Sequence, residues 1–104
     1  MKQEVLLWTG AGQIGMAIAR RVGYGKTIVV GDRSLENARR AAGTMEAAGF
    51  DVIPMEMDLS SRTSIRELIQ EGQRHGEITM LVNAAGVSPS QAPIETLLQV
   101  DLYG

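Results

Sequence analysis

The sequence predicts an α/β fold built on a parallel sheet. Four short apolar segments alternate with three segments whose apolar residues recur at the three-to-four spacing of a helix. Strands and helices that alternate in this way form a parallel sheet, and right-handed crossovers between the strands give the strand order 3-2-1-4. The 104 residues contain no linker and no further internal repeat, so residues 1–104 are expected to form one domain.

The first two strand–helix units are the most regular. A strand over residues 5–8 precedes a helix over residues 13–22. The second strand, residues 26–31, is apolar almost throughout, which is typical of a parallel strand covered on both faces. Ser34 is a suitable N-cap for the second helix, and Gly49 is expected to end it.

The third unit contains a residue that fixes its place in the sheet. Its strand is expected over residues 50–57 and includes Pro54. Because proline lacks the N–H that a central strand needs, we expect this strand at the sheet edge. A turn over residues 58–61 leads into the third helix, which Gly72 and the pair at 75–76 are expected to break.

The fourth strand is expected over residues 78–83, and a further helix starts over residues 94–103. No lysine or proline lies within the strand to block pairing at its free edge. The last helix also carries several large apolar residues. We therefore expect the chain to form a homo-oligomer through the fourth strand, the last helix or both.

Three glycines lie between the first strand and the first helix, in the order G-x-G-x-x-G. Strand, glycine turn and helix are the context that the dinucleotide-binding fingerprint requires. Gly10 would turn the chain off the strand, Gly12 would let a pyrophosphate approach the backbone, and Gly15 would let the helix pack closely on the sheet. The amino end of the helix would offer N–H groups to the phosphates. A turn that is glycine-rich only for packing is the alternative.

Asp32 follows the second strand, about twenty residues after the glycines, where a ribose-binding carboxylate belongs. A carboxylate there accepts hydrogen bonds from the ribose 2′-hydroxyl and repels a 2′-phosphate, which favours NAD. Arg33 keeps NADP possible, because a guanidinium beside the ribose can pair with that phosphate. An Asx-turn that caps the next helix is the other interpretation of Asp32.

Together with the glycine turn, two further segments resemble the N-terminal half of the short-chain dehydrogenases/reductases, which have a Rossmann-like fold. Asp58 and Leu59 follow the third strand, and Asn83-Ala84-Ala85-Gly86 closes the fourth. The resemblance implies that Asp58 bonds the adenine amino group beside the Leu59 backbone, and that segment 83–86 lines the ribose and nicotinamide side. The predicted cofactor site comprises Gly10, Ala11, Gly12, Gln13, Ile14, Gly15, Asp32, Arg33, Asp58, Leu59, Asn83, Ala84, Ala85 and Gly86.

The chain departs from the family pattern in four ways. The glycine turn looks one residue shorter than the commonest family form, and Ala84 stands where a second asparagine is frequent. Asp101 stands where the family has a helix asparagine that organises a proton-relay water. The family's catalytic serine and Tyr-x-x-x-Lys pair lie further along the fold. No such pair occurs here, since Ile28 stands four residues after Tyr24 and Tyr103 is one residue from the end. No catalytic residue is therefore assigned in this chain.

Composition limits the remaining functions. The net charge of −2 gives no reason to expect nucleic acid or an anionic membrane as a partner. With no cysteine and one histidine, a disulfide framework, a thiolate metal site and a histidine-cluster metal site are all excluded. No apolar run approaches the roughly 18 residues of a membrane span. We expect a cytoplasmic protein without a metal.

The resemblance implies an NAD(P)-dependent oxidoreductase that moves a hydride between a nicotinamide and an alcohol or carbonyl substrate. The chain would be its cofactor-binding part, incomplete relative to the family and inactive alone. A stand-alone, non-catalytic dinucleotide-binding or interaction module is the alternative. An S-adenosylmethionine-dependent methyltransferase also uses a glycine-rich turn and a following acidic residue, but the segment 83–86 argues against it.

Overall fold

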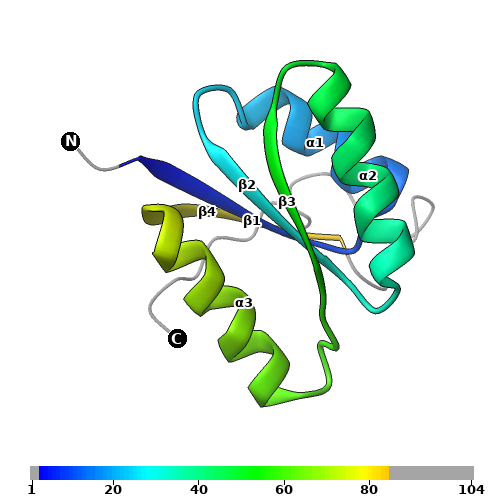
Figure 1. Cartoon of the computed structure of the whole chain (residues 1–104), viewed down its shortest axis with the longest axis vertical. Helices are drawn as coiled ribbons and strands as arrows, with labels where there is room; N and C mark the ends of the chain where they lie inside the picture. Colours follow the sequence, from blue (N-terminus) through cyan, green and yellow to red (C-terminus); the bar gives the residue numbers. More distant parts are fainter. Residues whose placement is uncertain (1–2, 85–104) are drawn as a thin grey trace.

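The computed structural model describes residues 3–84 of the chain. Four strands and three helices alternate along these residues, as the sequence predicts (Figure 1). In chain order they are β1 (Glu4–Thr9), α1 (Gln13–Val22), β2 (Thr27–Asp32), α2 (Leu35–Ala47), β3 (Asp51–Glu56), α3 (Arg62–His75) and β4 (Glu77–Asn83). The expected helix over residues 94–103 lies outside the described part.

The four strands form one parallel sheet in the order β3-β2-β1-β4, which confirms the predicted topology and the Rossmann-like α/β fold class. Pro54 lies in β3 at the edge of this sheet, as its missing N–H predicts. Helices α1 and α2 cover one face and α3 covers the other (Figure 1). The sheet is therefore the middle layer of three, and its inner strands are buried on both sides.

Strand β1 shows why a continuous apolar run suits this position. Leu6 and Trp8 point toward α1 and α2, where they join the larger of two buried clusters. Val5 and Leu7 point the other way, into a smaller cluster with Leu68 of α3. Side chains alternate across a strand, so the four positions from Val5 to Trp8 all need apolar residues when both faces are covered.

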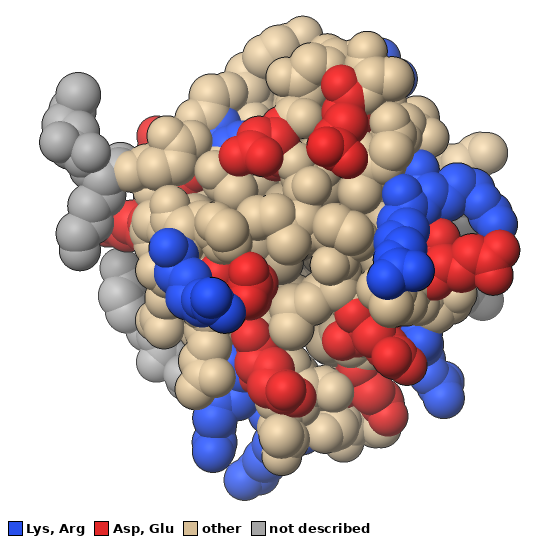
Figure 2. Space-filling view, in the orientation of Figure 1, with Lys and Arg blue, Asp and Glu red and all other residues tan. Residues whose placement is uncertain are grey.

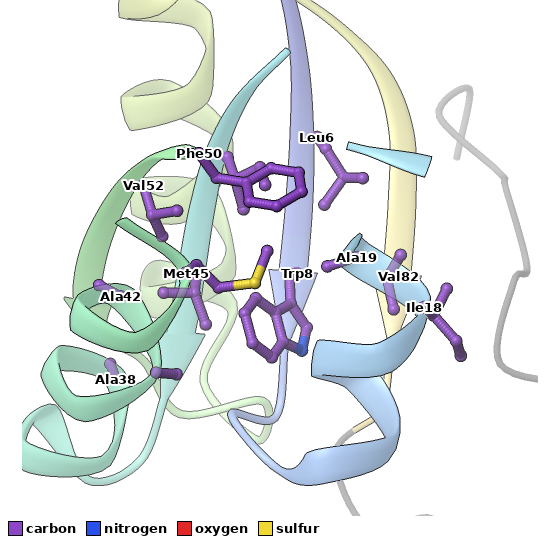
Figure 3. Packing of buried hydrophobic residues seen from close by; sticks show 13 residues of the cluster. Leu6, Trp8, Ile18, Ala19, Ala38, Ala42, Met45, Phe50, Val52 and Val82 are labelled. Carbon is purple, nitrogen blue, oxygen red and sulfur yellow. The ribbon is translucent and has the colours of Figure 1, made fainter. Parts of the chain in front are cut away.

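The larger cluster fills the space between the sheet and the helices α1 and α2 (Figure 3). Met45 of α2 lies over the indole of Trp8, and both side chains are completely buried. Small residues on the buried side of α2, among them Ala38 and Ala42, let that helix approach the sheet closely. The helices thereby hold the end of β1 and the turn after it in a fixed position.

Capping residues mark where helices α2 and α3 begin and where α2 ends. Ser34 Oγ accepts a hydrogen bond from the Asn37 N–H at 3.2 Å, which confirms Ser34 as the N-cap of α2. Ser61 Oγ caps α3 in the same way through the Ser64 N–H. A cap of this kind contributes about 1 kcal/mol to stability. Gly49 follows the end of α2 with φ +96°, a conformation that favours glycine.

The expectation that Gly72 breaks the third helix is wrong. Helix α3 continues through Gly72 to His75 and ends at Gly76. Gly72 is buried against the sheet, and a Cβ there would lie 2.8 Å from Leu7 Cδ2 and 3.1 Å from Ile78 Cδ1. This glycine therefore gives the helix close contact with β1 and β4, and that gain offsets its low helix propensity, about 1 kcal/mol below alanine.

Candidate cofactor site

The predicted site residues gather at one edge of the sheet because all four strands are parallel. Thr9 pairs with Gly31 on one side and with Asn83 on the other, so the ends of β1, β2 and β4 lie level. The carboxyl ends of parallel strands are where open α/β sheets bind their ligands. A cavity of about 590 Å³ opens there, lined by Gly10, Ala11, Gly12, Gly31, Asp32, Arg33, Asn37, Met57, Asp58, Leu59, Ser60 and Ala84.

The three glycines of the turn have different surroundings. Gly10 has φ +84°, which only glycine adopts without strain. A Cβ on Gly12 would meet nothing within 4 Å, so the space in front of this residue is open. A Cβ on Gly15 would overlap Trp8 Nε1 and lie 3.1 Å from the Gly10 carbonyl oxygen. The first glycine therefore makes the turn, the second leaves space, and the third allows close packing.

The amino end of α1 lacks the side-chain cap that the other two helices have. Its N-cap is Gly12, which supplies no side-chain hydrogen bond, and its first turn carries no acidic residue. The first N–H groups of a helix have no partner within the helix, so those of Gln13, Ile14 and Gly15 remain available. The positive end of the helix dipole adds an attraction of about 0.3 to 1 kcal/mol for an anion placed there.

Hydrogen bonds fix the turn on the sheet. The Gly10 N–H donates to the Gly31 carbonyl at 2.9 Å, which ties the turn to β2. The Gly10 carbonyl accepts two hydrogen bonds, one from the Gly12 N–H at 2.8 Å and one from Trp8 Nε1 at 2.9 Å. Nothing in the G-x-G-x-x-G motif itself indicates this contact with Trp8.

Asp32 lies at the end of β2 and faces the turn. Its Oδ2 accepts a hydrogen bond from the Ala11 N–H at 2.8 Å, and its Oδ1 accepts one from the Ser34 N–H at 2.9 Å. The second bond is the Asx-turn that the alternative interpretation predicts. The first bond joins the carboxylate to the glycine turn. Each oxygen can accept a further hydrogen bond, so this role in the fold leaves Asp32 able to bind a hydroxyl.

Asp58 follows β3 and lines the same cavity as Asp32. Its Oδ1 accepts hydrogen bonds from the Ser60 Oγ at 2.7 Å and from the Ser60 N–H at 2.9 Å. These two bonds, with a smaller contribution from the positive charge of Arg33, hold the pKa of Asp58 below the ordinary carboxyl range. Asp58 is therefore an ionised acceptor at neutral pH, and the neighbouring Leu59 is exposed.

Asn83 ends β4 beside the turn. Thr9 Oγ1 donates to Asn83 Oδ1 at 2.7 Å, and the Ala84 N–H donates to the Thr9 carbonyl at 2.8 Å. Ala84 lines the cavity, whereas Asn83 lines a second, apolar hollow of about 900 Å³ between α3 and β4. Ala85, Gly86 and Asp101 lie outside the described residues.

The cavity thus brings together eight of the predicted cofactor residues, and its lining adds Gly31, Asn37, Met57 and Ser60, which the sequence analysis did not assign. Signals for two of these residues exist in the sequence. Asn37 lies in the first turn after the N-cap Ser34, and Ser60 stands two residues after Asp58, the spacing of an Asx-turn. Gln13, Ile14 and Gly15 form the first turn of α1 and are not among the residues that line the cavity.

The described part of the chain contains neither a cluster of metal-binding side chains nor a membrane-spanning helix. Within residues 3–84, no three side chains of histidine, aspartate or glutamate are grouped so that they could hold a metal ion. None of the helices in this part of the chain is long and apolar enough to cross a membrane. Acidic and basic side chains are interspersed on the face that Figure 2 shows.

Comparison with known proteins indicates the family to which the chain belongs. The sequence profile described as short chain dehydrogenase matches residues 4–102. A short-chain dehydrogenase/reductase of Alternaria brassicicola, bsc3, is 39% identical over 104 residues, which are the whole of this chain and 38% of that protein. The chain therefore spans less than two fifths of this curated relative's length.

Two solved structures superpose on the described sheet and helices. The F189W actinorhodin polyketide ketoreductase with NADPH has a TM-score of 0.74 and 35% identity, over 82% of this chain and 34% of that one. A short-chain dehydrogenase/reductase from Burkholderia phymatum in complex with NAD has a TM-score of 0.68 and 27% identity, over 76% of this chain and 29% of that one. With the profile match over nearly its full length, the chain belongs to the short-chain dehydrogenase/reductase family.

Proposed function

We propose that residues 1–104 form the dinucleotide-binding domain of an NAD(P)-dependent oxidoreductase. The complete protein would transfer a hydride between the nicotinamide and an alcohol or carbonyl carbon. The observation that carries this proposal is the open space in front of Gly12, at the uncapped amino end of α1, with Asp32 and Asp58 on the same cavity.

The pyrophosphate would lie over Gly12. A side chain at this position would occupy the space, and the free N–H groups of Gln13 and Ile14 are the donors that a phosphate oxygen accepts from. The absence of an acidic residue in the first turn of α1 removes the repulsion that a carboxylate there would exert. The turn thus fits a dianionic ligand without any rearrangement of the described backbone.

The adenosine half would bind between the two carboxylates. Asp32 would accept hydrogen bonds from the ribose hydroxyls on the lone pairs that Ala11 and Ser34 leave free. Asp58, held ionised by Ser60, would accept a bond from the adenine amino group. Asn37 opens onto the same cavity and can donate or accept there.

NAD is the favoured cofactor. A 2′-phosphate would lie beside the carboxylate of Asp32, and the two negative charges would repel each other. Arg33 lines the cavity and could pair with a phosphate, but its charge also acts on Asp58, which lies close by. The NADPH in the actinorhodin ketoreductase and the NAD in the Burkholderia phymatum protein show that both cofactors occur among similar proteins.

The catalytic step needs groups that this chain does not supply. A bound nicotinamide provides the hydride acceptor or donor, and a proton must be exchanged with the substrate oxygen. No Tyr-x-x-x-Lys pair occurs in the 104 residues, so the chain alone is expected to bind dinucleotide without turnover. A non-catalytic dinucleotide-binding module is the second candidate. In-frame continuation of the gene to a Tyr-x-x-x-Lys sequence would decide for the oxidoreductase.

Isothermal titration calorimetry with NAD, NADP and S-adenosylmethionine tests the cofactor assignment. We expect saturable heat with NAD, weaker binding of NADP and no binding of S-adenosylmethionine. NADP that binds more tightly than NAD would overturn the role given to Asp32. Tightest binding of S-adenosylmethionine, or no binding of any of the three, would overturn the proposed function.

A further inference from the structure

The only tryptophan of the sequence lies directly beneath the glycine turn. Trp8 is completely buried and is the last residue of β1 that points toward α1 and α2. In Figure 3 its indole lies beside Met45, with the ring nitrogen on the side of α1. An apolar residue would serve equally well to fill this space, so the polar edge of the indole calls for a separate explanation.

That polar edge contacts the turn. Trp8 Nε1 donates to the Gly10 carbonyl oxygen at 2.9 Å, and the Gly12 N–H donates to the same oxygen at 2.8 Å. The peptide unit that joins Gly10 to Ala11 is planar, so the direction of its carbonyl also sets the direction of the Ala11 N–H. That N–H donates to Asp32 Oδ2 at 2.8 Å. One peptide plane is thereby held at both ends.

The orientation of this plane matters for an anionic ligand. With its carbonyl turned down toward the indole, the partial negative charge of the oxygen points into the fold rather than into the space in front of Gly12. A carbonyl that rotated toward that space would repel a phosphate. Because Gly10 has φ +84° and no side chain, the backbone itself gives this peptide little resistance to rotation.

Gly15 completes the arrangement. A Cβ at this position would overlap the indole nitrogen, so the indole of Trp8 requires glycine at position 15. The first turn of α1 therefore sits directly on the indole that holds the Gly10 carbonyl. The indole of Trp8 thus contacts both the first turn of α1, which carries the N–H donors, and the peptide plane of the glycine turn.

We propose that Trp8 is a positioning residue for the dinucleotide: its indole N–H keeps the Gly10 carbonyl out of the pyrophosphate site. The inference rests on the proposed function, because it assumes that a dinucleotide binds over Gly12. Its effect is largest at the pyrophosphate. The hydrogen bond from the Ser34 N–H to Asp32 Oδ1 does not involve Gly10, so the carboxylate in the adenosine half of the site keeps one anchor and depends less on the indole N–H than the pyrophosphate does.

Replacement of the N–H alone tests this role. Since Trp8 is the only tryptophan, growth of a tryptophan auxotroph on 3-benzothienylalanine changes this position and no other. The analogue has the shape of tryptophan with sulfur in place of the N–H group. A matched control carries 5-fluorotryptophan, which keeps the N–H. All three proteins are the full 104-residue chain, and their folding is compared by circular dichroism.

Loss of one hydrogen bond to the turn is expected to raise the Kd for NAD about fivefold in the benzothienyl protein. The Kd for adenosine, which lacks the pyrophosphate, should rise clearly less than that for NAD, and the fluorotryptophan protein should match the unmodified chain for both ligands. Equal weakening of NAD and adenosine would mean that the indole only supports the fold, and unchanged NAD binding would mean that its N–H has no role. Either result overturns the proposal and leaves the proposed function intact.

Failure of the unmodified chain to bind NAD would overturn the proposed function, and the role of Trp8 with it. If the benzothienyl protein does not fold, the unmodified chain still gives an answer by ¹⁵N NMR. Its single indole N–H resonance should shift on addition of NAD and shift clearly less on addition of adenosine. If the chemical shift of this resonance does not change at saturating NAD, the positioning role is overturned.

Discussion

Asp32 and Ala11 are joined by a hydrogen bond of 2.8 Å from the Ala11 N–H to the Asp32 Oδ2 atom. This bond connects the end of β2 to the glycine turn after β1. The carboxylate that we assign to the ribose is thus also part of the framework that holds the turn. Substitutions of Asp32 are therefore expected to change both cofactor choice and the stability of the turn.

Asp32→Asn should reverse the cofactor preference. The amide removes the negative charge that repels a 2′-phosphate, so the affinity for NADP relative to NAD should rise about tenfold, which corresponds to about 1.4 kcal/mol. Calorimetry with both dinucleotides measures the ratio. Glu36→Gln is a matched control, because it removes one exposed carboxylate from the first turn of α2 at an equal change in net charge. If the ratio is the same in both variants, Asp32 does not face the ribose.

Ser60→Ala should raise the pKa of Asp58. The substitution removes the Ser60 Oγ donor, which is the largest cause of the lowered pKa, and leaves the weaker bond from the Ser60 N–H. A carboxyl NMR titration measures this change. Ser64→Ala serves as the control, since the structure assigns the Ser64 side chain no contact with Asp58. A pKa that does not move in Ser60→Ala would show that the hydrogen bond is not formed in solution.

The same lowered pKa gives a pH dependence of stability. A carboxyl group whose pKa is lower in the folded than in the unfolded chain stabilises the fold above its unfolded pKa, about 3.9. That contribution is lost as the pH falls through the folded pKa of Asp58. The loss of stability on acidification should accordingly be smaller in Ser60→Ala than in the unmodified chain. Urea unfolding at pH values from about 6 down to about 3, a range that includes the ordinary pKa of an aspartate, measures the difference.

The 104-residue chain should show no dehydrogenase turnover. No tyrosine–lysine pair of the required spacing is present to exchange a proton with the substrate oxygen. NADH formation with a broad panel of alcohols measures this directly by absorbance. Turnover that disappears in Asp32→Ala would contradict the prediction, because it would show that other residues of this chain perform the proton transfer.

The chain should associate with itself. Strand β4 is an edge of the described sheet, and no lysine or proline lies between Ile78 and Val82 to prevent pairing. The apolar hollow between α3 and β4, which Leu59 and Leu81 help to line, adds surface that a second copy could cover. Light scattering at micromolar concentration should give at least a dimer, and Leu81→Lys should shift it toward monomer. A monodisperse monomer before substitution would contradict the expectation.

Much of the fold follows from local patterns. The alternation of apolar strands with amphipathic helices predicts the sheet order, and Pro54 places β3 at the edge. These features depend on hydrophobic periodicity and on the missing N–H of proline, which can both be recognised within a short segment of sequence. The sheet then brings the ends of β1, β2 and β4 level, so a site predicted from separate segments forms one cavity.

Features that depend on contact between distant segments could not be predicted in this way. Gly72 looks like a helix breaker in sequence, and only the packed helix shows that it contacts Leu7 and Ile78. Trp8 looks like one more core residue, because the motif gives no sign that Gly15 and the Gly10 carbonyl lie against its nitrogen. In both cases the decisive partner lies on another element.

The pairing of Gly12→Val with Gly43→Val tests the central claim most directly. Both glycines have open space where a Cβ would lie, but Gly12 faces the cavity and Gly43 lies on the exposed side of α2. Both variants should retain most of their stability in urea unfolding. By calorimetry, Gly43→Val should bind NAD like the unmodified chain and Gly12→Val should show no binding, because the branched side chain occupies the place of the pyrophosphate. Normal NAD binding by Gly12→Val would contradict the account and make the glycine turn purely structural.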